Sequence, residues 1–351
     1  MSMEMERIVR ALLRCEPRPG PAARFAWVLA ALMAALASSH AAAQEDMAEA
    51  PQESTEPIRV HIGILWNRIE AMSLKDNTYV VDFYIWLRWM PREIDGEPFD
   101  AGATFEVVNG SIDSRNESEI RELDDGGMYA SYRVRATIVH YFDVTRYPID
   151  SYTLPIEIED ALDTNDVVYI ADVANSALGD QFRVPGFRHE APRFEVVPHI
   201  YQTNYGDPET PTGAESEYSR FIASVFVERP SKAFALKMFA GLYVATLIGF
   251  LAMFVSPLDL DPRFGLGVAA IFAAVATQIV ISSNLPETNT LTLADQVSLL
   301  ATIFIFLSLV ESTYALSLCK RQREDAAKRL DRRSFVCLLA LYAAVNVWVL
   351  M

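Results

Sequence analysis

Residues 238–256 read MFAGLYVATLIGFLAMFVS, a run of 19 residues from Met238 to Ser256 without a charged side chain. About 20 apolar residues are enough for a helix to cross the hydrocarbon core of a bilayer, so this run predicts a membrane span. Three similar runs follow: Phe264–Ile281, with 18 uncharged residues, Gln296–Val310, with 15 before the single Glu311, and Ser334–Met351, with 18. A buried core helix could account for one such run, but four in succession predict a membrane domain.

The charges of the chain are divided in the same way as its apolar residues. The 351 residues carry a formal net charge of −16, and the segment Glu45–Pro230 holds 35 acidic and 15 basic residues. After Pro230 there are 8 acidic and 10 basic residues. This division argues against a single soluble globule. The acidic part also argues against nucleic acid as a partner, since phosphate binding needs an excess of lysine and arginine.

The topology follows from the connection between the third and fourth runs. We expect spans at about 234–256, 263–282, 295–318 and 334–351 within a membrane domain of residues 231–351. The segment Lys320–Arg333 holds seven basic and three acidic residues. The positive-inside rule therefore predicts a cytoplasmic loop at 319–333, with the acidic region and the C-terminus on the other side of the membrane.

The N-terminus has the order of a secretory signal. Arginines from Arg7 to Arg24 precede the apolar stretch Phe25–Ala37, and small residues up to Ala43 offer a cleavage site. We predict a signal peptide at 1–43, the alternative being a first helix that is never cleaved. The polar segment 44–56 is predicted to be disordered.

Between residues 57 and 230 the pattern is short alternating runs that turn residues interrupt. In Tyr79–Trp89 (YVVDFYIWLRW) polar and apolar side chains alternate, and Tyr129–Val139 and Arg220–Val227 behave similarly. Period-two alternation rich in β-branched and aromatic residues predicts an antiparallel β-sandwich. Of the three cysteines none lies between Glu45 and Pro230, so no disulfide closes this domain.

One segment between two of these runs carries a family resemblance. Residues Phe142–Asp150 read FDVTRYPID, which resembles the aromatic-Pro-aliphatic-Asp loop of the pentameric ligand-gated ion channels, the Cys-loop receptor superfamily. His140 and Leu154 stand where that family places its two bridging cysteines, as in prokaryotic members. Three further motifs match in register: Glu228-Arg229-Pro230 before the first span, Arg263–Val268 at the start of the second, and Asn284-Leu285-Pro286 after it.

The resemblance implies a homopentamer around a central pore that the second span lines. At helical spacing the pore-lining stripe consists of Gly265, Ala269, Phe272, Ala276 and Ile279. Rings of Phe272 and Ile279 would form a hydrophobic gate. The alternative is that these small residues serve close helix packing.

Selectivity is expected at the inner mouth of this pore. Charge rings at a constriction select ions, and the mouth carries Asp259, Asp261 and Arg263. The aspartates favour cations, whereas the run after Arg263 resembles anion-selective relatives, so anion selectivity is the alternative. A third interpretation makes the aspartates helix caps.

The resemblance also implies a coupling contact between the sandwich and the spans. Asp76 and Asp150 match the acids that meet the pre-helix arginine of the family, here Arg229. Tyr147, Pro148 and Pro286 are expected to pack beside this cluster. The alternative is a set of ordinary solvated charges.

The ligand site is expected between subunits. Tyr84, Trp86 and Arg88 match one side, and Tyr201, Tyr205 and Tyr218 lie in or beside the segment that resembles the capping loop on the other. Acidic residues stand where many relatives have an aromatic side chain. They are Glu157, Glu159 and Asp160, followed by Asp163 and Asp166. Such a cluster predicts either proton binding or a calcium modulator at Glu157, Glu159 and Asp160, the alternative being a solvated acidic edge.

These expectations combine into one function. We predict a homopentameric ion channel of a bacterial inner membrane, with its ectodomain outside, gated by a small ligand or protons and conducting cations. An anion channel of the same family, or a membrane-anchored periplasmic binding module without conduction, are the alternatives. The lipid bilayer, permeant inorganic ions and further copies of the chain are the expected partners. An enzyme is not expected, because the sequence has no nucleophile elbow, phosphate loop or metal-ligand motif.

Overall fold

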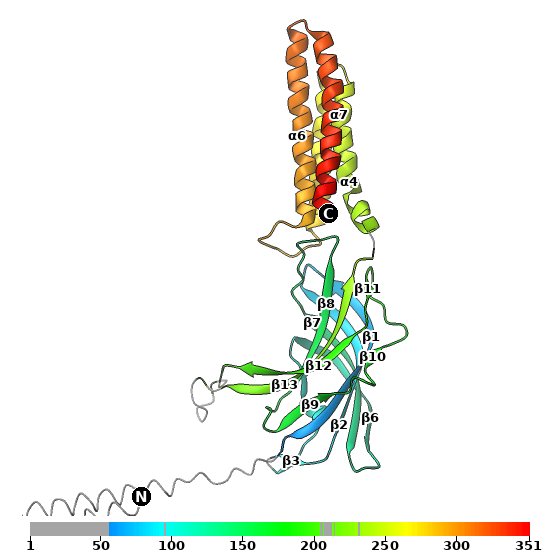
Figure 1. Ribbon diagram of the computed structural model, residues 1–351, viewed down its shortest axis with the longest axis vertical. Coiled ribbons are helices and arrows are strands. Elements are labelled where there is room, and N and C mark those ends of the chain that lie inside the picture. The colour runs from blue at the N-terminus through cyan, green and yellow to red at the C-terminus, as the bar shows by residue number, and fades with distance from the viewer. Residues whose placement is uncertain (1–55, 95, 204–205, 207–212, 214, 231) are drawn as a thin grey trace, which may run out of the picture. The chain divides into compact units, whose positions relative to one another are not determined.

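The computed structural model describes residues 56–351 apart from 95, 204–205, 207–212, 214 and 231. The expected signal peptide and all of the segment 44–56 except Glu56 lie outside the described residues. The described chain begins as a β-domain and ends as four long helices (Figure 1).

The β-domain consists of two main sheets. The order in the six-stranded sheet is β10-β1-β2-β7-β6, and β9 also pairs with β1. The order in the five-stranded sheet is β11-β13-β8-β5, and β12 also pairs with β13. The strands of the first sheet are β1 Ile58–Ser73, β2 Thr78–Trp89, β6 Gly110–Glu122, β7 Met128–Val139, β9 Val167–Ala171 and β10 Ala177–Leu178. Those of the second are β5 Phe105–Val107, β8 Ser151–Asp160, β11 Arg188–His189, β12 Arg193–Tyr201 and β13 Ser216–Glu228. The short α3 (Ala101–Thr104) and the pair β3 (Glu93–Ile94) and β4 (Glu97–Pro98) complete the domain.

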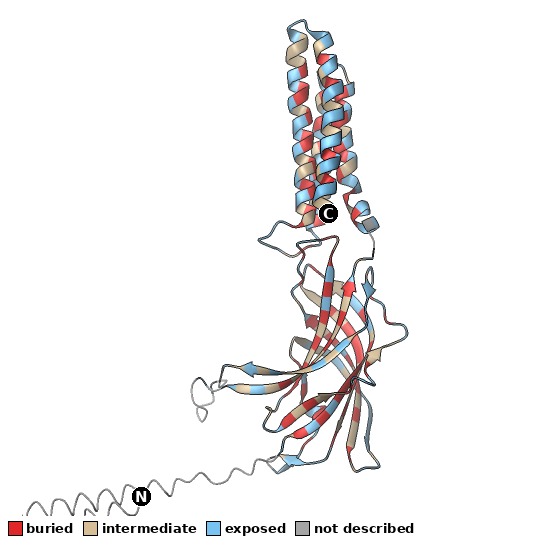
Figure 2. Cartoon of the chain, in the orientation of Figure 1, coloured by how far each residue is buried: buried red, intermediate tan, exposed pale blue. Residues whose placement is uncertain are grey.

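The alternating sequence of β2 places one face of the strand in the core. Phe83, Ile85 and Leu87 are fully buried, while Tyr84 and Trp86 between them are partly exposed. Strands β8 and β13 of the other sheet bury alternate residues in the same way (Figure 2). Their buried side chains form one cluster with those of β2. The β-sandwich is therefore confirmed. It is not antiparallel throughout, because β9 and β10 pair with β1 in parallel.

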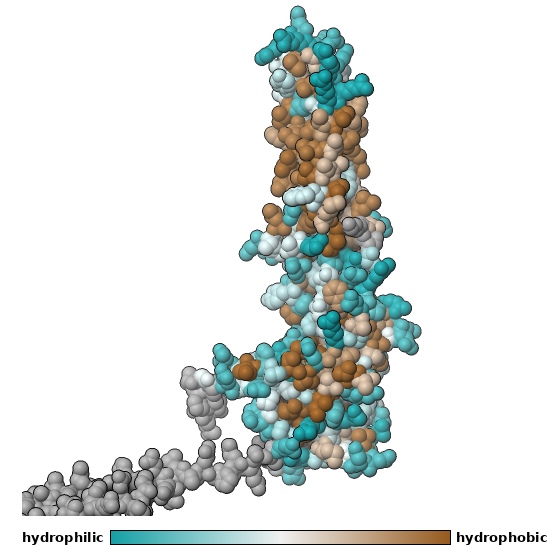
Figure 3. Space-filling model, viewed as in Figure 1, coloured by the Kyte–Doolittle hydropathy of each residue, from teal (hydrophilic) through white to brown (hydrophobic). Residues whose placement is uncertain are grey.

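The four helices have the length and composition of membrane spans. The first span, Ala233–Phe254, contains α4 (Lys232–Leu251) and the 3₁₀ turn η1 (Ala252–Phe254), and α5 (Leu260–Ser282), α6 (Leu293–Lys320) and α7 (Glu324–Leu350) follow. Their exposed surfaces form an apolar band that ends where the basic residues of the α6–α7 connection begin (Figure 3). Of the apolar 18-residue segment of α7, just 11% is buried, the smallest share among the four helices. Since such a surface is stable in lipid, we assign these helices to a membrane.

The connection between α6 and α7 is shorter than the sequence predicted. We expected a loop at 319–333, but α6 continues to Lys320 and α7 already begins at Glu324. Glu324 and Asp325 occupy the first turn of α7, where acidic side chains stabilise a helix N-terminus. Ala327 and Asp331 are buried, so this basic segment packs as a helix against its neighbours. The sequence prediction followed hydropathy alone, which does not detect a polar helical extension.

Candidate functional site

The proposed pore-lining stripe lies on the exposed side of α5. All five of its residues are exposed, and the two largest are highly so, with Phe272 at 72% and Ile279 at 63%. The opposite side is buried and consists largely of small residues: Gly267, Ala270 and Ala274, with Ile281. Close packing requires them, because a Cβ on Gly267 would lie 2.2 Å from Cδ2 of Leu309 in α6. Close packing of small residues thus applies to the buried face of α5. The pore-lining role of the exposed stripe remains a prediction.

At the inner end of α5, the three charged side chains that were expected together at the pore mouth lie in different environments. Asp259 and Asp261 are exposed, and neither appears among the ion pairs of the described residues. Asp259 occupies the N-cap position of α5, but its side chain makes no capping hydrogen bond there. Arg263 is fully buried. The expectation that Arg263 contributes to a charge ring is wrong, because its guanidinium points into the helical bundle.

Arg263 binds two carboxylates from other helices inside this bundle. Its Nη2 lies 2.6 Å from Oδ1 of Asp331 in α7 and 3.1 Å from Oε2 of Glu311 in α6. Its Nη1 donates to the carbonyl oxygen of Val255, 2.9 Å away. Two carboxylates against one guanidinium leave this buried group, the Arg263 triad, with one excess negative charge when all three are ionised. Buried charges of this kind are costly unless paired, so the triad fixes three helices to one another.

Two polar atoms of the triad have no partner in the described part of the chain. They are Nε of Arg263 and Oε1 of Glu311, both buried. The sequence offered one sign of this group, since Glu311 interrupts an otherwise uncharged span. Asp331 lies in the segment that the sequence predicts as a loop. The sequence therefore does not predict that it joins Arg263 and Glu311 in the triad.

The coupling contact exists in part. The guanidinium of Arg229, which follows β13, forms an ion pair with the carboxylate of Asp150 before β8. The hydroxyl of Tyr152 donates to the same carboxylate. The rings of Phe187 and Phe234 each lie 4.4 Å from the Arg229 guanidinium carbon. Because Phe234 belongs to α4, this cation–π contact joins the end of the sandwich to the first span.

Of the other residues expected in this contact, Tyr147 lies near Arg229, whereas Asp76 does not form the expected ion pair with it. Tyr147 is buried, and its ring centre lies 5.6 Å from the guanidinium carbon of Arg229. The bond between Tyr147 and Pro148 is cis. The expectation that Asp76 meets Arg229 is wrong: its carboxylate accepts a hydrogen bond from Ser73 Oγ, 2.6 Å away, within its own turn.

A second link connects this loop to the helices. The backbone nitrogen of Leu293, at the start of α6, donates to the carbonyl oxygen of Thr145 over 2.8 Å. Thr292 and Asp295 form a capping box at the same helix end, which holds the first turn of α6 rigid. Pro286 lies in the preceding α5–α6 connection and is partly buried. Its packing against Tyr147 and Pro148 remains a prediction.

On β2, three candidate ligand residues share the partly exposed face of the strand, as expected. Asp172 accepts hydrogen bonds from Trp86 Nε1, at 3.1 Å, and from Arg88 Nη2, at 3.2 Å. Tyr84 lies beside them, 5.7 Å from the guanidinium carbon of Arg133. Gly63 of β1 is the direct cross-strand partner of Trp86, and a Cβ at this glycine would lie 2.3 Å from the indole ring. The indole therefore occupies the space that a side chain at position 63 would need.

The acidic residues of β8 form a different arrangement from the one predicted. Glu157 and Glu159 are bridged by Arg220 of β13, whose Nη1 and Nε lie 2.6 Å from Glu157 Oε2 and Glu159 Oε1. The hydroxyl of Tyr201 donates to Glu159 Oε2 over 3.0 Å. The rings of Tyr201 and Tyr218 are in edge contact, 5.5 Å apart. Tyr205, the third aromatic residue of this group, lies outside the described residues.

Asp160 points to the other face of β8. Its Oδ2 accepts from Thr104 Oγ1 over 2.8 Å, and its Oδ1 accepts from the backbone nitrogen of Leu162 over 3.1 Å. Burial raises the pKa of this carboxyl above its ordinary value. The calcium site expected at Glu157, Glu159 and Asp160 is wrong, since no group of three metal-binding side chains converges in the described chain. Arg220, which the sequence analysis did not single out, takes the place of a cation.

Comparison with known proteins adds one informative similarity. No protein-family profile matches the chain. The chain is 20% identical over 319 residues to the "Proton-gated ion channel" of Gloeobacter violaceus, which covers 87% of this chain and 86% of that protein. The similarity is to an ion channel. A match of this extent includes most of the sandwich and of the helical bundle, and it fits the layout of a pentameric ligand-gated channel. It points to a family of proteins that are not enzymes.

Proposed function

We propose that the chain is the subunit of a homopentameric ion channel that protons or a small ligand open and that conducts cations. The observation that carries this proposal is the division of α5 into two faces. One face packs closely within the subunit through small residues, and the other presents Phe272 and Ile279 outward. Five such faces around an axis would enclose an apolar path, narrowest at these two rings.

Proton gating or gating by a small ligand is the second part of the proposal. The named relative is a proton-gated channel, and this chain offers a carboxyl whose environment favours proton uptake, Asp160, on the face of β8 opposite to Glu157 and Glu159. The partly exposed residues Tyr84, Trp86 and Arg88 of one subunit, facing Tyr201 and Tyr218 of the next, would form an inter-subunit site. A signal at this site would reach the helices through the Arg229–Asp150 pair and the Thr145–Leu293 hydrogen bond.

Cation selectivity is proposed on the exposed carboxylates at the inner end of α5. With Arg263 buried, Asp259 and Asp261 are the charged side chains at this mouth that can face an ion path. Rings of carboxylates attract cations. Because Arg263 is buried, it does not attract anions at this mouth, which weakens the case for anion selectivity. We also propose the bacterial inner membrane as the location, with the basic α6–α7 turn in the cytoplasm.

The test is a measurement of mass and of current on the same preparation. The protein is purified in mild detergent, and its mass is determined by light scattering with the detergent subtracted. It is then placed in a planar bilayer under a salt gradient while the pH is lowered stepwise on either side. We expect a mass of five subunits and a current that appears on one-sided acidification and reverses near the cation potential.

Other outcomes separate the alternatives. A monomer or dimer contradicts the channel. An intact pentamer without current under protons, calcium or small amines favours a binding module. A reversal near the chloride potential favours the anion channel and assigns selectivity to other residues.

A further inference from the structure

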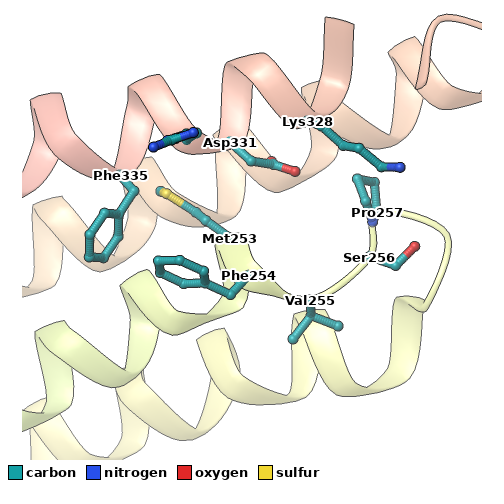
Figure 4. A pocket seen from close by; sticks show the side chains of 9 residues that line it. Met253, Phe254, Val255, Ser256, Pro257, Lys328, Asp331 and Phe335 are labelled. Carbon is teal, nitrogen blue, oxygen red and sulfur yellow. The ribbon is translucent and has the colours of Figure 1, made fainter. Parts of the chain in front are cut away.

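A cavity of about 640 Å³ lies at the inner end of the helical bundle, between the α4–α5 connection and the first turns of α7 (Figure 4). It belongs neither to the proposed pore face nor to the ectodomain site. Its volume is that of a pocket for a small organic molecule. Its lining divides into an apolar part and a basic part, and this division indicates what it binds.

The apolar part includes Met253, Phe254 and Phe335, beside Val255 and Pro257. Phe254 is 69% exposed, and its ring meets that of Phe335 edge to face, with 4.8 Å between the ring centres. These residues stand at the ends of two uncharged runs, Met238–Ser256 and Ser334–Met351. They therefore lie at the depth where the hydrocarbon of a bilayer meets its headgroups, the level at which aromatic side chains commonly gather.

The basic part consists of Lys328 and Arg332, which also line the cavity. They are four residues apart on α7 and so lie on one face of the helix, one turn apart. Both are exposed, and neither appears among the ion pairs of the described residues. Asp331 also lines the cavity, but Arg263 binds both of its carboxylate oxygens. The cavity therefore presents two positive charges, and the one excess negative charge of the adjacent Arg263 triad leaves this region with a net positive charge.

We infer that this cavity binds an anionic phospholipid of the cytoplasmic leaflet, with the phosphate between Lys328 and Arg332 and an acyl chain along Met253, Phe254 and Phe335. A free phosphate would leave this exposed apolar wall in contact with water, whereas a lipid covers it. A zwitterionic lipid would bring a third positive charge to the two of Lys328 and Arg332. The basic turn of α6 and α7 places this end of the bundle on the cytoplasmic side by the positive-inside rule. The inference requires that the helical bundle lies in a membrane. It does not depend on whether the protein conducts ions.

The experiment measures lipid bound to the full-length protein. The purified oligomer is titrated in detergent with phosphatidylglycerol or with phosphatidylcholine, and bound lipids are counted by native mass spectrometry. The site variant is Lys328→Gln with Arg332→Gln. The matched control is Arg329→Gln with Arg333→Gln, which removes the same charge from exposed positions on the same helix that do not line the cavity. Native oligomer mass in both variants establishes that the fold is kept.

A basic side chain near a membrane surface contributes about a fivefold increase in affinity for an anionic headgroup. We therefore expect the site variant to bind phosphatidylglycerol about 25-fold more weakly and the control variant to bind it within about twofold of the parent. Equal losses in the two variants would mean diffuse attraction to a basic helix and would overturn the site. Equal binding of the two lipids by the parent protein would overturn it as well. Displacement of the lipid by millimolar glycerol phosphate would show that the headgroup alone is recognised, which contradicts the role of the apolar wall.

Discussion

The Arg263 triad predicts an unequal response to the removal of its charges. In the parent protein one guanidinium faces two carboxylates, at 2.6 Å from Asp331 and 3.1 Å from Glu311. Arg263→Gln leaves both acids buried without a counter-charge. Removal of one partner from a buried ion pair costs about 3–5 kcal/mol. Glu311→Gln instead removes the excess negative charge and leaves one well-formed pair, so its cost should be within about 1 kcal/mol of zero or a gain.

The assay is thermal unfolding of the detergent-solubilised oligomer, read as the loss of its monodisperse chromatographic peak. We expect Arg263→Gln to lower the Tm by an amount of the order of 10 °C and Glu311→Gln to change it by about 3 °C or less in either direction. The control is Arg329→Gln, which removes an exposed arginine from the same end of the bundle. If Glu311→Gln is as destabilising as Arg263→Gln, the excess charge is compensated by a partner outside this subunit and the reasoning is refuted.

Three further predictions concern gating, selectivity and pH. Phe272→Ala removes the largest side chain of the exposed stripe and should raise the leak or open probability at unchanged expression; currents like those of the parent would place the stripe elsewhere. Asp261→Asn should lower the permeability of cations relative to anions, visible in the reversal potential under a salt gradient, and Asp259→Asn should do so less, since it lies further from the helix. Burial raises the pKa of Asp160, so ionisation of this group in the folded state costs stability. Its share of stability is therefore present below the unfolded pKa of about 3.9 and is lost as pH rises through the raised folded pKa. Asp160→Asn should flatten this part of the stability–pH curve, and an unchanged slope would assign it to another group.

The sequence predicted those features that depend on regular local patterns. The alternation in Tyr79–Trp89 is sufficient to assign each side chain to the core face or the outer face of the strand, because successive side chains of a strand point to opposite faces. Uncharged runs likewise located four spans, because the bilayer fixes their length. The Arg229–Asp150 pair was found through the family resemblance, on two motifs that flank the end of the sandwich.

The errors arise where the structure depends on contacts between distant parts of the chain. The direction of Arg263 is decided by Asp331, 68 residues away, and nothing in the local pattern of α5 distinguishes a buried arginine from one that faces a pore. Glu157 and Glu159 were interpreted as a cation site because the register that brings Arg220 between them is a property of the β8–β13 pairing. Asp76 was assigned by its sequence position before β2, while its own turn provides the partner, Ser73.

The pairing of Gly63 with Trp86 has a consequence for the history of this protein. A Cβ at position 63 would fall within 2.3 Å of the indole, so no other amino acid fits there while the tryptophan keeps its place. Each of the two residues thus restricts what the other position can accept. Among descendants of a common ancestor, any lineage with a side chain at position 63 should carry a residue smaller than tryptophan at position 86. The two substitutions should have become fixed together, or the substitution of the tryptophan by a smaller residue should have come first.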